Sequence, residues 1–163
     1  MPERKTIDAA RRDKKQGKSA STQAGEFVDE EMHHIREGKH GARSAKQAIA
    51  IGLSKARRAG INLPPGKNAS AATKRKAAQD SAHAGDGAMP VSARRSRATS
   101  AALKREGQAA ASTTALSRHA KTAAKQRGPA ARKASAEKAV RTKGAAGRRT
   151  AAKKAARTRS SGG

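Results

Sequence analysis

Large apolar side chains are scarce in this chain, and their scarcity limits how much of it can fold around a core. Of the 163 residues, 56 count as hydrophobic, but 40 of these are alanine and only 16 carry a larger apolar side chain. Burying one large apolar side chain contributes roughly 1.5–3 kcal/mol, whereas ordering each residue costs about 1.5 kcal/mol of conformational entropy. Sixteen such side chains cannot offset that cost over the whole length. We therefore exclude a single globular domain of 163 residues.

Charge is unevenly distributed along the chain. The sequence has 38 Lys and Arg residues against 12 Asp and Glu, a formal net charge of +26. Residues 1–65 contain 14 basic and 8 acidic residues, whereas residues 66–163 contain 24 basic and 4 acidic residues. The larger apolar residues show the opposite gradient, with eleven in the first part and five in the second. Because this step coincides with the turn-forming sequence Pro64-Pro65-Gly66, we predict a small folded head followed by a basic tail.

The predicted fold class is mostly α with extensive disorder, in which a short helical hairpin precedes a tail of marginal helices. The predicted parts are a basic N-terminal segment (1–19), a helical hairpin head (20–65), a flexible linker (66–91) and a basic, Lys/Arg/Ala-rich tail of low complexity (92–163). Alanine, lysine and arginine favour helix. However, Arg149, Lys153 and Arg157 place like charges four residues apart, which destabilises an isolated helix. We therefore expect the free tail to be fraying helix and coil.

The first helix of the predicted hairpin has clear start and stop signals. Ser21 or Thr22 is the expected N-cap, and Gly38 is the expected C-terminal stop. Its apolar residues follow helical spacing: Phe27, Val28, Met32 and Ile35. A weaker helix is expected at residues 4–16, with Thr6 as its cap.

The second helix of the hairpin has equally clear ends. Ser44-Ala45-Lys46-Gln47 has the pattern of a capping box, in which Gln47 reaches back to the Ser44 amide. Gly60 is the expected stop, and Ile61 is placed to make the hydrophobic contact of a Schellman motif.

Five histidines raise the question of a metal site. Glu30-x-x-His33 and Glu31-x-x-His34 have the carboxylate–imidazole spacing used in di-iron helical bundles. Such bundles need two of these motifs on separate helices that face one core, whereas here both motifs overlap on one helix. We expect His34 to face solvent or the basic loop at residues 39–43, and we predict neither a metal nor another cofactor.

Catalysis and membrane insertion are not expected. The chain has no Cys, no serine in a nucleophile elbow and no Walker lysine loop, so we predict no enzyme and no catalytic residue. The longest apolar run is about six residues, Ala48 to Leu53, which is too short to span a bilayer. Because an apolar secretory segment is also missing at the N-terminus, we expect a cytoplasmic protein.

The basic tail is the part of the sequence with chemistry that points to a partner. Lys and Arg side chains that neutralise phosphates release condensed counterions, and this gives binding that ignores base sequence and weakens with salt. The predicted nucleic-acid-binding residues are Lys74, Arg75, Lys76, Arg94, Arg95, Arg97, Lys104, Arg105, Arg132, Lys133, Lys138, Arg141, Lys143, Arg148, Arg149, Lys153, Lys154, Arg157 and Arg159. Proteins that bind single strands stack the bases on aromatic side chains, and Phe27 is the single aromatic residue of this chain. We therefore favour the backbone of double-stranded DNA.

Part of the head resembles a known family. The core Lys-Gln-Ala-Ile-Ala-Ile-Gly-Leu-Ser-Lys-Ala-Arg-Arg-Ala-Gly (46–60) resembles that of a small family of basic bacterial proteins with no assigned activity. The resemblance extends over roughly residues 20–65 and implies a bacterial cytoplasmic protein without a catalytic residue. The tail is similar in composition to the Lys/Ala-rich tails of linker histones and bacterial histone-like proteins.

The function expected from the sequence is non-specific DNA binding by a histone-like, nucleoid-associated protein. The first alternative is an RNA- or ribosome-associated basic protein. The second alternative is a scaffold whose head docks a protein partner or self-associates, while the tail localises the complex.

Overall fold

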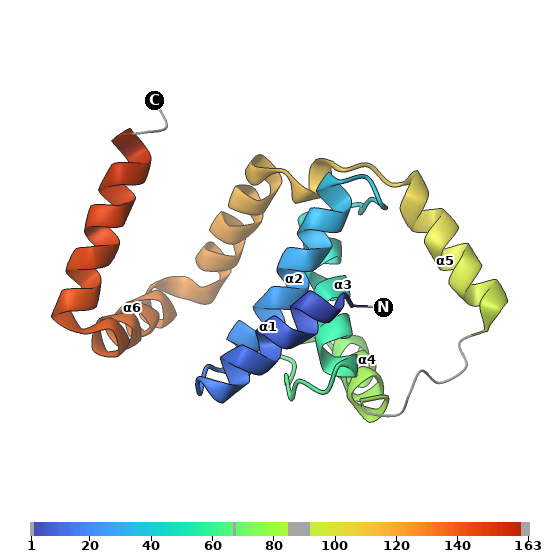
Figure 1. Ribbon diagram of the computed structural model, residues 1–163, viewed down its shortest axis with the longest axis horizontal. Helices are drawn as coiled ribbons and strands as arrows, with labels where there is room; N and C mark the ends of the chain where they lie inside the picture. Colours follow the sequence, from blue (N-terminus) through green and yellow to red (C-terminus); the bar gives the residue numbers. More distant parts are fainter. Residues whose placement is uncertain (1, 67, 85–91, 161–163) are drawn as a thin grey trace. The chain divides into compact units, whose positions relative to one another are not determined.

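The computed structural model describes residues 2–66, 68–84 and 92–160. The helices are α1 (Arg4–Lys15), α2 (Ala20–Arg36), α3 (Ala45–Arg58), α4 (Ala71–Ala82), α5 (Ala93–Arg105), the short 3-10 helix η1 (Ala109–Ala111) and α6 (Thr113–Ser160) (Figure 1). The described residues contain no β-strand, which confirms the mostly α prediction. The chain divides into two compact units, residues 1–119 and residues 120–163.

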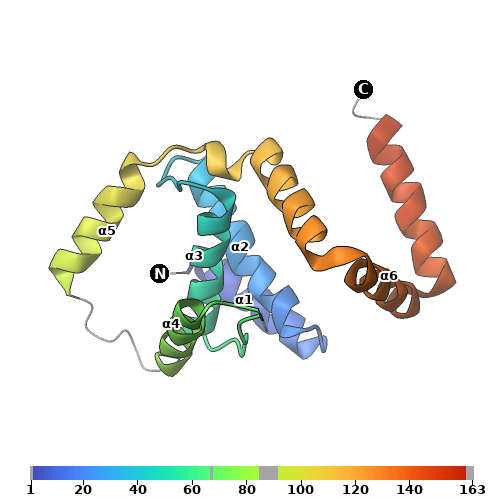
Figure 2. The same cartoon turned by 180° about the vertical axis from the view of Figure 1, so that it is seen from behind.

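Helices α2 and α3 pack side by side in the first unit, as Figures 1 and 2 show from opposite sides. Their backbones approach closely at Gly52, where an added Cβ would lie 2.8 Å from the Cα of Val28. The predicted apolar face of α2 is confirmed, since Met32 and Ile35 are buried and Val28 is half-buried against the same cluster. Phe27 is also fully buried. The hairpin predicted from the sequence is therefore the centre of this unit.

The predicted C-terminal ends of both hairpin helices are confirmed. Gly38 has φ of +73° and Gly60 has φ of +88°, the left-handed conformation that glycine adopts without a steric penalty. After α3, the amide of Ile61 donates to the carbonyl of Ala56 at 3.1 Å, which is the long bond of a Schellman motif. Ile61 is buried, as that motif predicts.

The predicted starts of the first two helices are wrong. The cap of α2 is Ser19, whose hydroxyl accepts from the Thr22 amide at 3.4 Å, so Ser21 and Thr22 lie inside the first turn. In α1 the cap position is Glu3, because its carbonyl already accepts from the amide of Thr6 at 3.1 Å. Thr6 is a buried residue within the helix.

The capping box at the start of α3 is confirmed in one of its two bonds. Ser44 accepts from the Gln47 amide at 3.2 Å, as predicted. The Gln47 side chain accepts from the amide of Arg43 at 2.9 Å rather than from that of Ser44. The predicted return bond is therefore displaced by one residue.

Two small apolar clusters form the core of this unit, and both rely on alanine. One cluster joins α2 and α3 to η1 through Met32, Ile35, Ala42, Ala48, Ala110 and Ala111. The other joins α1, α2 and the end of α3 through Ala10, Ala24, Phe27, Ala56 and Ile61, with Ile7 packed against it. Alanine lets helices approach closely, so a core can form with few large side chains.

Helix α4 lies within residues 66–91, where the sequence predicts a flexible linker. Ser70 caps this helix by accepting from the Thr73 amide at 3.2 Å. Asp80, which is 1% exposed, fastens it to α3 by accepting from Ser54 at 2.7 Å and from Arg58 at 3.1 Å. Residues 67 and 85–91 of the predicted linker lie outside the described residues.

The chain from Leu103 to Ala111, here called the return segment, packs back onto the hairpin. The amide of Gly41 donates to the Leu103 carbonyl at 2.9 Å, and the amide of Ala42 donates to the Gly107 carbonyl at 3.2 Å. At the end of the return segment, the carbonyl of Ala111 accepts from Arg36 Nε at 3.0 Å. The compact unit therefore extends to residue 119, well beyond the predicted head of residues 20–65.

Helix α6 is interrupted at two glycines. Gly128 (φ +74°, ψ 168°) and Gly144 (φ +60°, ψ −177°) have non-helical angles that only glycine adopts readily. They divide α6 into helical segments at residues 113–127, 129–143 and 145–160, each about 22 Å long at 1.5 Å per residue.

This helical tail corrects the prediction of extensive disorder. Arg149, Lys153 and Arg157 all lie within regular helix, where fraying helix and coil are predicted. Alanine is the strongest helix former, and like-charge pairs four residues apart oppose it by only about 0.2–0.5 kcal/mol each. The intrinsic preference of alanine outweighs that repulsion.

Candidate nucleic-acid interface

All nineteen residues predicted to bind nucleic acid are exposed in the structure. They are distributed over three helices. Three lie on α4 (Lys74, Arg75, Lys76), five lie on α5 (Arg94, Arg95, Arg97, Lys104, Arg105), and the remaining eleven lie on α6. Eight of them thus belong to the first unit and eleven to the second.

The basic residues of the first unit are partly neutralised by acids. Lys76 Nζ lies 3.3 Å from Asp80 Oδ1, and Arg58 Nε lies 3.1 Å from the same oxygen. In the hairpin, Lys55 Nζ lies 2.6 Å from Glu31 Oε2. Pairs of this kind reduce the positive field that the first unit presents to a polyanion.

Helix α6 differs because acids are almost absent from it. Glu137 is its one acidic residue, against fifteen Lys and Arg residues. Four of these fifteen are missing from the predicted set: Arg118, Lys121, Lys125 and Arg127, all of them exposed. The predicted set consists mainly of Lys and Arg residues that are close together in the sequence. These four residues are spaced two to four apart, and on a helix this spacing also gives a high density of positive charge.

The basic residues surround the α6 segments instead of lining one face. Successive residues of an α-helix are rotated by about 100°. Counted from Arg148, this rotation places Arg149, Lys153 and Lys154 at about 100°, 140° and 240° around the last segment. A helix charged on all sides can contact phosphates in many orientations. It has no single face with which to read a groove.

Two similar six-residue sequences occur sixteen residues apart in the tail, and each one lies at the end of a helical segment. Residues 138–143 (Lys-Ala-Val-Arg-Thr-Lys) end the middle segment immediately before Gly144. The similar residues 154–159 (Lys-Ala-Ala-Arg-Thr-Arg) end the last segment. Each of the two sequences therefore belongs to its own basic helical segment, and a glycine joins the two segments.

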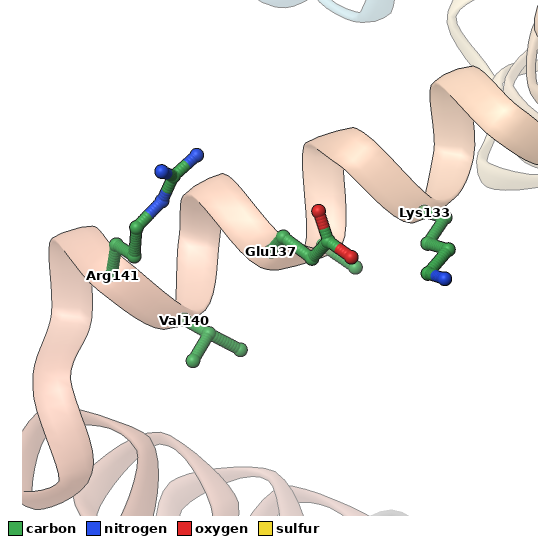
Figure 3. A pocket seen from close by; sticks show the side chains of 5 residues that line it. Lys133, Glu137, Val140 and Arg141 are labelled. Carbon is green, nitrogen blue, oxygen red and sulfur yellow. The ribbon is translucent and has the colours of Figure 1, made fainter.

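One hollow among the basic residues of the tail is open and lies on a single helix. The hollow in Figure 3 is lined by Lys133, Ala136, Glu137, Val140 and Arg141, which all belong to one segment of α6. Val140 is 42% exposed, and its neighbours in the hollow are charged or alanine. A hollow walled by a single helix buries little of a small molecule, because a ligand pocket normally surrounds most of its ligand.

Comparison with known proteins gives a match for the N-terminal segment and the head. Among the described residues, no helix combines the length and apolar character needed to cross a membrane. Comparison with curated proteins and with solved structures gives no match. Residues 3–67, which span α1, α2 and α3, match the model of a family of unknown function, DUF6496.

Proposed function

We propose that this protein binds double-stranded DNA with little sequence preference and acts as a histone-like, nucleoid-associated protein of bacteria. The basic residues of α5 and α6 make most of the contacts to phosphates, and the basic residues of α4 make fewer. The single observation that carries the proposal is the charge of α6, where fifteen exposed Lys and Arg residues stand against Glu137 alone. Such a surface binds through counterion release, which depends on phosphate density and not on base identity.

The glycine joints support a duplex as the ligand. Segments of about 22 Å are shorter than one turn of B-DNA, about 34 Å, so a rigid helix of full tail length could not follow the curved backbone. Gly128 and Gly144 separate the tail into short rods, each of which can lie along a different stretch of phosphates.

The burial of Phe27 argues against single-stranded nucleic acid as the ligand. Phe27 is fully buried between α1, α2 and α3, so its ring is not available to stack on a base. Base–aromatic stacking is a main source of affinity in single-strand binders. Without it, the tail is better suited to the regular backbone of a duplex.

A competition experiment tests the proposal. A labelled DNA duplex is bound by the full chain and then displaced by unlabelled duplexes of unrelated sequence or by a structured RNA hairpin of equal charge. We expect all DNA duplexes to compete equally, within about threefold, and the RNA to compete more weakly. Stronger competition by RNA would establish the RNA-associated alternative, and a strong preference for one DNA sequence would contradict non-specific binding.

A further inference from the structure

Three metal-ligating side chains meet where the loop after α2 folds back against that helix. Glu31 and His34 lie on α2, and His40 lies in the loop at residues 39–43. One ligand atom from each side chain lies within 4.8 Å of the other two. We propose that these three residues bind a divalent transition-metal ion, with Zn²⁺ as the ion best suited to them. The proposal does not depend on nucleic-acid binding.

Hydrogen bonds orient both imidazole rings for such a role. His34 Nε2 lies 2.9 Å from Glu3 Oε1, and His40 Nδ1 lies 3.2 Å from the carbonyl oxygen of Gly41. Carboxylate and carbonyl oxygens accept hydrogen bonds, so these two nitrogens carry the protons. In the neutral form, which is the form of histidine that binds a metal, the other nitrogen of each ring has a free lone pair. A metal-binding histidine is normally held in this way, through its second nitrogen.

The buried carboxylate is aimed at the same place. The side chain of Glu31 is 0% exposed, and its Oε1 has no hydrogen-bond partner among the described residues. His40 Nε2 lies 3.4 Å from this oxygen, and Lys55 Nζ lies 2.6 Å from the other carboxylate oxygen. A buried acceptor without a donor costs about 1–3 kcal/mol. A bound cation would remove that cost.

Neighbouring charges favour a cation. Glu30 Oε1 also lacks a hydrogen bond among the described residues and lies 4.0 Å from His34 Nδ1. Together with Glu3 and Glu31, it makes three carboxylates around two histidines, against the ammonium groups of Lys55 and of Lys39, which lies 3.3 Å from Glu3 Oε1. This is an acidic site in a chain whose net charge is +26.

The donor set selects the kind of ion. Two imidazole nitrogens and one carboxylate oxygen suit Zn²⁺, which forms bonds of about 2.0–2.2 Å to such ligands and takes a further ligand, such as water, at a fourth position. Mg²⁺ and Ca²⁺ prefer oxygen ligands throughout.

The return segment holds the loop that supplies His40. The amides of Gly41 and Ala42, the two residues after His40, donate to carbonyls of Leu103 and Gly107. His40 is therefore fixed by contacts that are about sixty residues away in sequence, and a preorganised ligand binds metal more tightly than a mobile one.

Titration of the full chain with Zn²⁺ tests the site. The protein is first treated with a chelator, which is then removed, and binding is measured by isothermal titration calorimetry. We expect one saturable Zn²⁺ site per chain, a rise in Tm with Zn²⁺, and neither effect with Mg²⁺. His40→Ala should weaken Zn²⁺ binding at least tenfold, and His34→Ala should do the same.

His33→Ala is the matched control. This histidine is adjacent to His34 but is 56% exposed and contacts Asp29 on its own helix, so its removal should change the Zn²⁺ affinity less than twofold. Bound Co²⁺ should give a four-coordinate visible spectrum in the wild type and in the control, but not in His40→Ala. The proposal is overturned if no saturable site exists, or if the His33 and His40 variants lose affinity equally. His40 lies in a loop, so its variant is informative even if His34→Ala fails to fold.

Discussion

Asp80 shows how single side chains hold this alanine-rich unit together. Burial alone would raise the pKa of Asp80, but hydrogen bonds from Ser54 and Arg58 and the charge of Lys76 outweigh burial, so the pKa lies below its ordinary value. A carboxyl group whose pKa is lowered by folding stabilises the folded state whenever it is ionised. Asp80 therefore links α4 to α3 electrostatically as well as by contact.

Replacing Asp80 by Asn should lower the free energy of unfolding by about 1.5–3 kcal/mol, the range for hydrogen bonds to charged groups. Urea unfolding followed by circular dichroism measures this change. Asp8→Asn is the control, because Asp8 pairs with Arg11 at 3.8 Å on the surface of α1 and should contribute less than about 0.5 kcal/mol.

The same pair of variants gives a pH dependence. The stability from Asp80 is fully present above the ordinary aspartate value, near pH 4, and is lost as the pH falls through the lower pKa of the folded state. The difference in stability between wild type and Asp80→Asn should therefore shrink from pH 5 to pH 2. A constant difference over that range would contradict the role given to this carboxylate.

Gly52 gives a second prediction about a single residue. An alanine Cβ there would lie 2.8 Å from the Cα of Val28 and 3.0 Å from the carbonyl oxygen of Phe27, so α2 and α3 would have to separate. We expect Gly52→Ala to destabilise the protein by about 1–3 kcal/mol, measured by thermal unfolding.

Gly25→Ala is the control for Gly52. Gly25 is exposed in α2 and has no atom within 4 Å of an added Cβ, so alanine should stabilise that helix by up to about 1 kcal/mol. The same substitution should thus have opposite signs at the two positions. Equal effects would show that helix propensity, and not the close approach of the helices, determines the outcome.

At the scale of elements, the return segment is fastened at Gly41. An added Cβ there would lie only 1.9 Å from the carbonyl oxygen of Glu106. We predict that Gly41→Ala releases the return segment and that the Ala42 amide, bonded to Gly107 in the structure, loses protection in hydrogen exchange. Gly107→Ala serves as the control, since an added Cβ at Gly107 has open space around it. Unchanged protection in Gly41→Ala would disprove this docking.

The joint at Gly144 can be tested separately. Alanine disfavours the backbone angles of Gly144, so Gly144→Ala should make the middle and last segments of α6 one continuous helix. The chain has no cysteine, so spin labels can be placed at introduced Ala136→Cys and Ala152→Cys without a background. Their separation should become about 24 Å in the variant, which is sixteen residues at 1.5 Å each, and should be shorter in the wild type. Identical separations would mean that Gly144 does not bend the helix.

The stops of the hairpin helices could be predicted from the sequence, whereas the docking of segments distant in sequence could not. The ends of α2 and α3 at Gly38 and Gly60 were predictable because a helix stop is determined by adjacent residues. The docking of the return segment depends on backbone carbonyls and on small residues such as Ala111, which have no recognisable pattern.

The histidines show the same limit at the candidate metal site. The sequence places His34 beside solvent or the loop, and in the structure it lies near the loop, with its ring centre 6.2 Å from that of His40. The spacing rule for Glu-x-x-His considered only one helix. It could not show that the loop brings His40 to Glu31.

At the scale of the whole molecule, charge and burial separate into different parts of the chain. The first unit has the buried clusters and most of the acids, whereas α6 has fifteen basic residues, one acid and no buried residue. Under the proposed function, folding and polyanion binding depend on different residues. Neutralising charges on α6 should weaken DNA binding while the fold of the first unit stays unchanged.

The salt dependence of DNA binding tests this central claim most directly. The logarithm of the binding constant falls with the logarithm of salt concentration by about 0.9 for each phosphate neutralised. In one full-length variant, six basic residues of the last α6 segment become Gln, which preserves helix propensity: Arg148, Arg149, Lys153, Lys154, Arg157 and Arg159. In the control, the same number of exposed charges is removed from α1: Arg4, Lys5, Arg11, Arg12, Lys14 and Lys15.

If α6 makes the phosphate contacts, the salt slope of the α6 variant should be shallower than that of the wild type by up to about 5, while the α1 variant keeps the wild-type slope. If both variants lose the same slope, binding responds only to total charge. That result would contradict the assignment of the DNA contacts to α6.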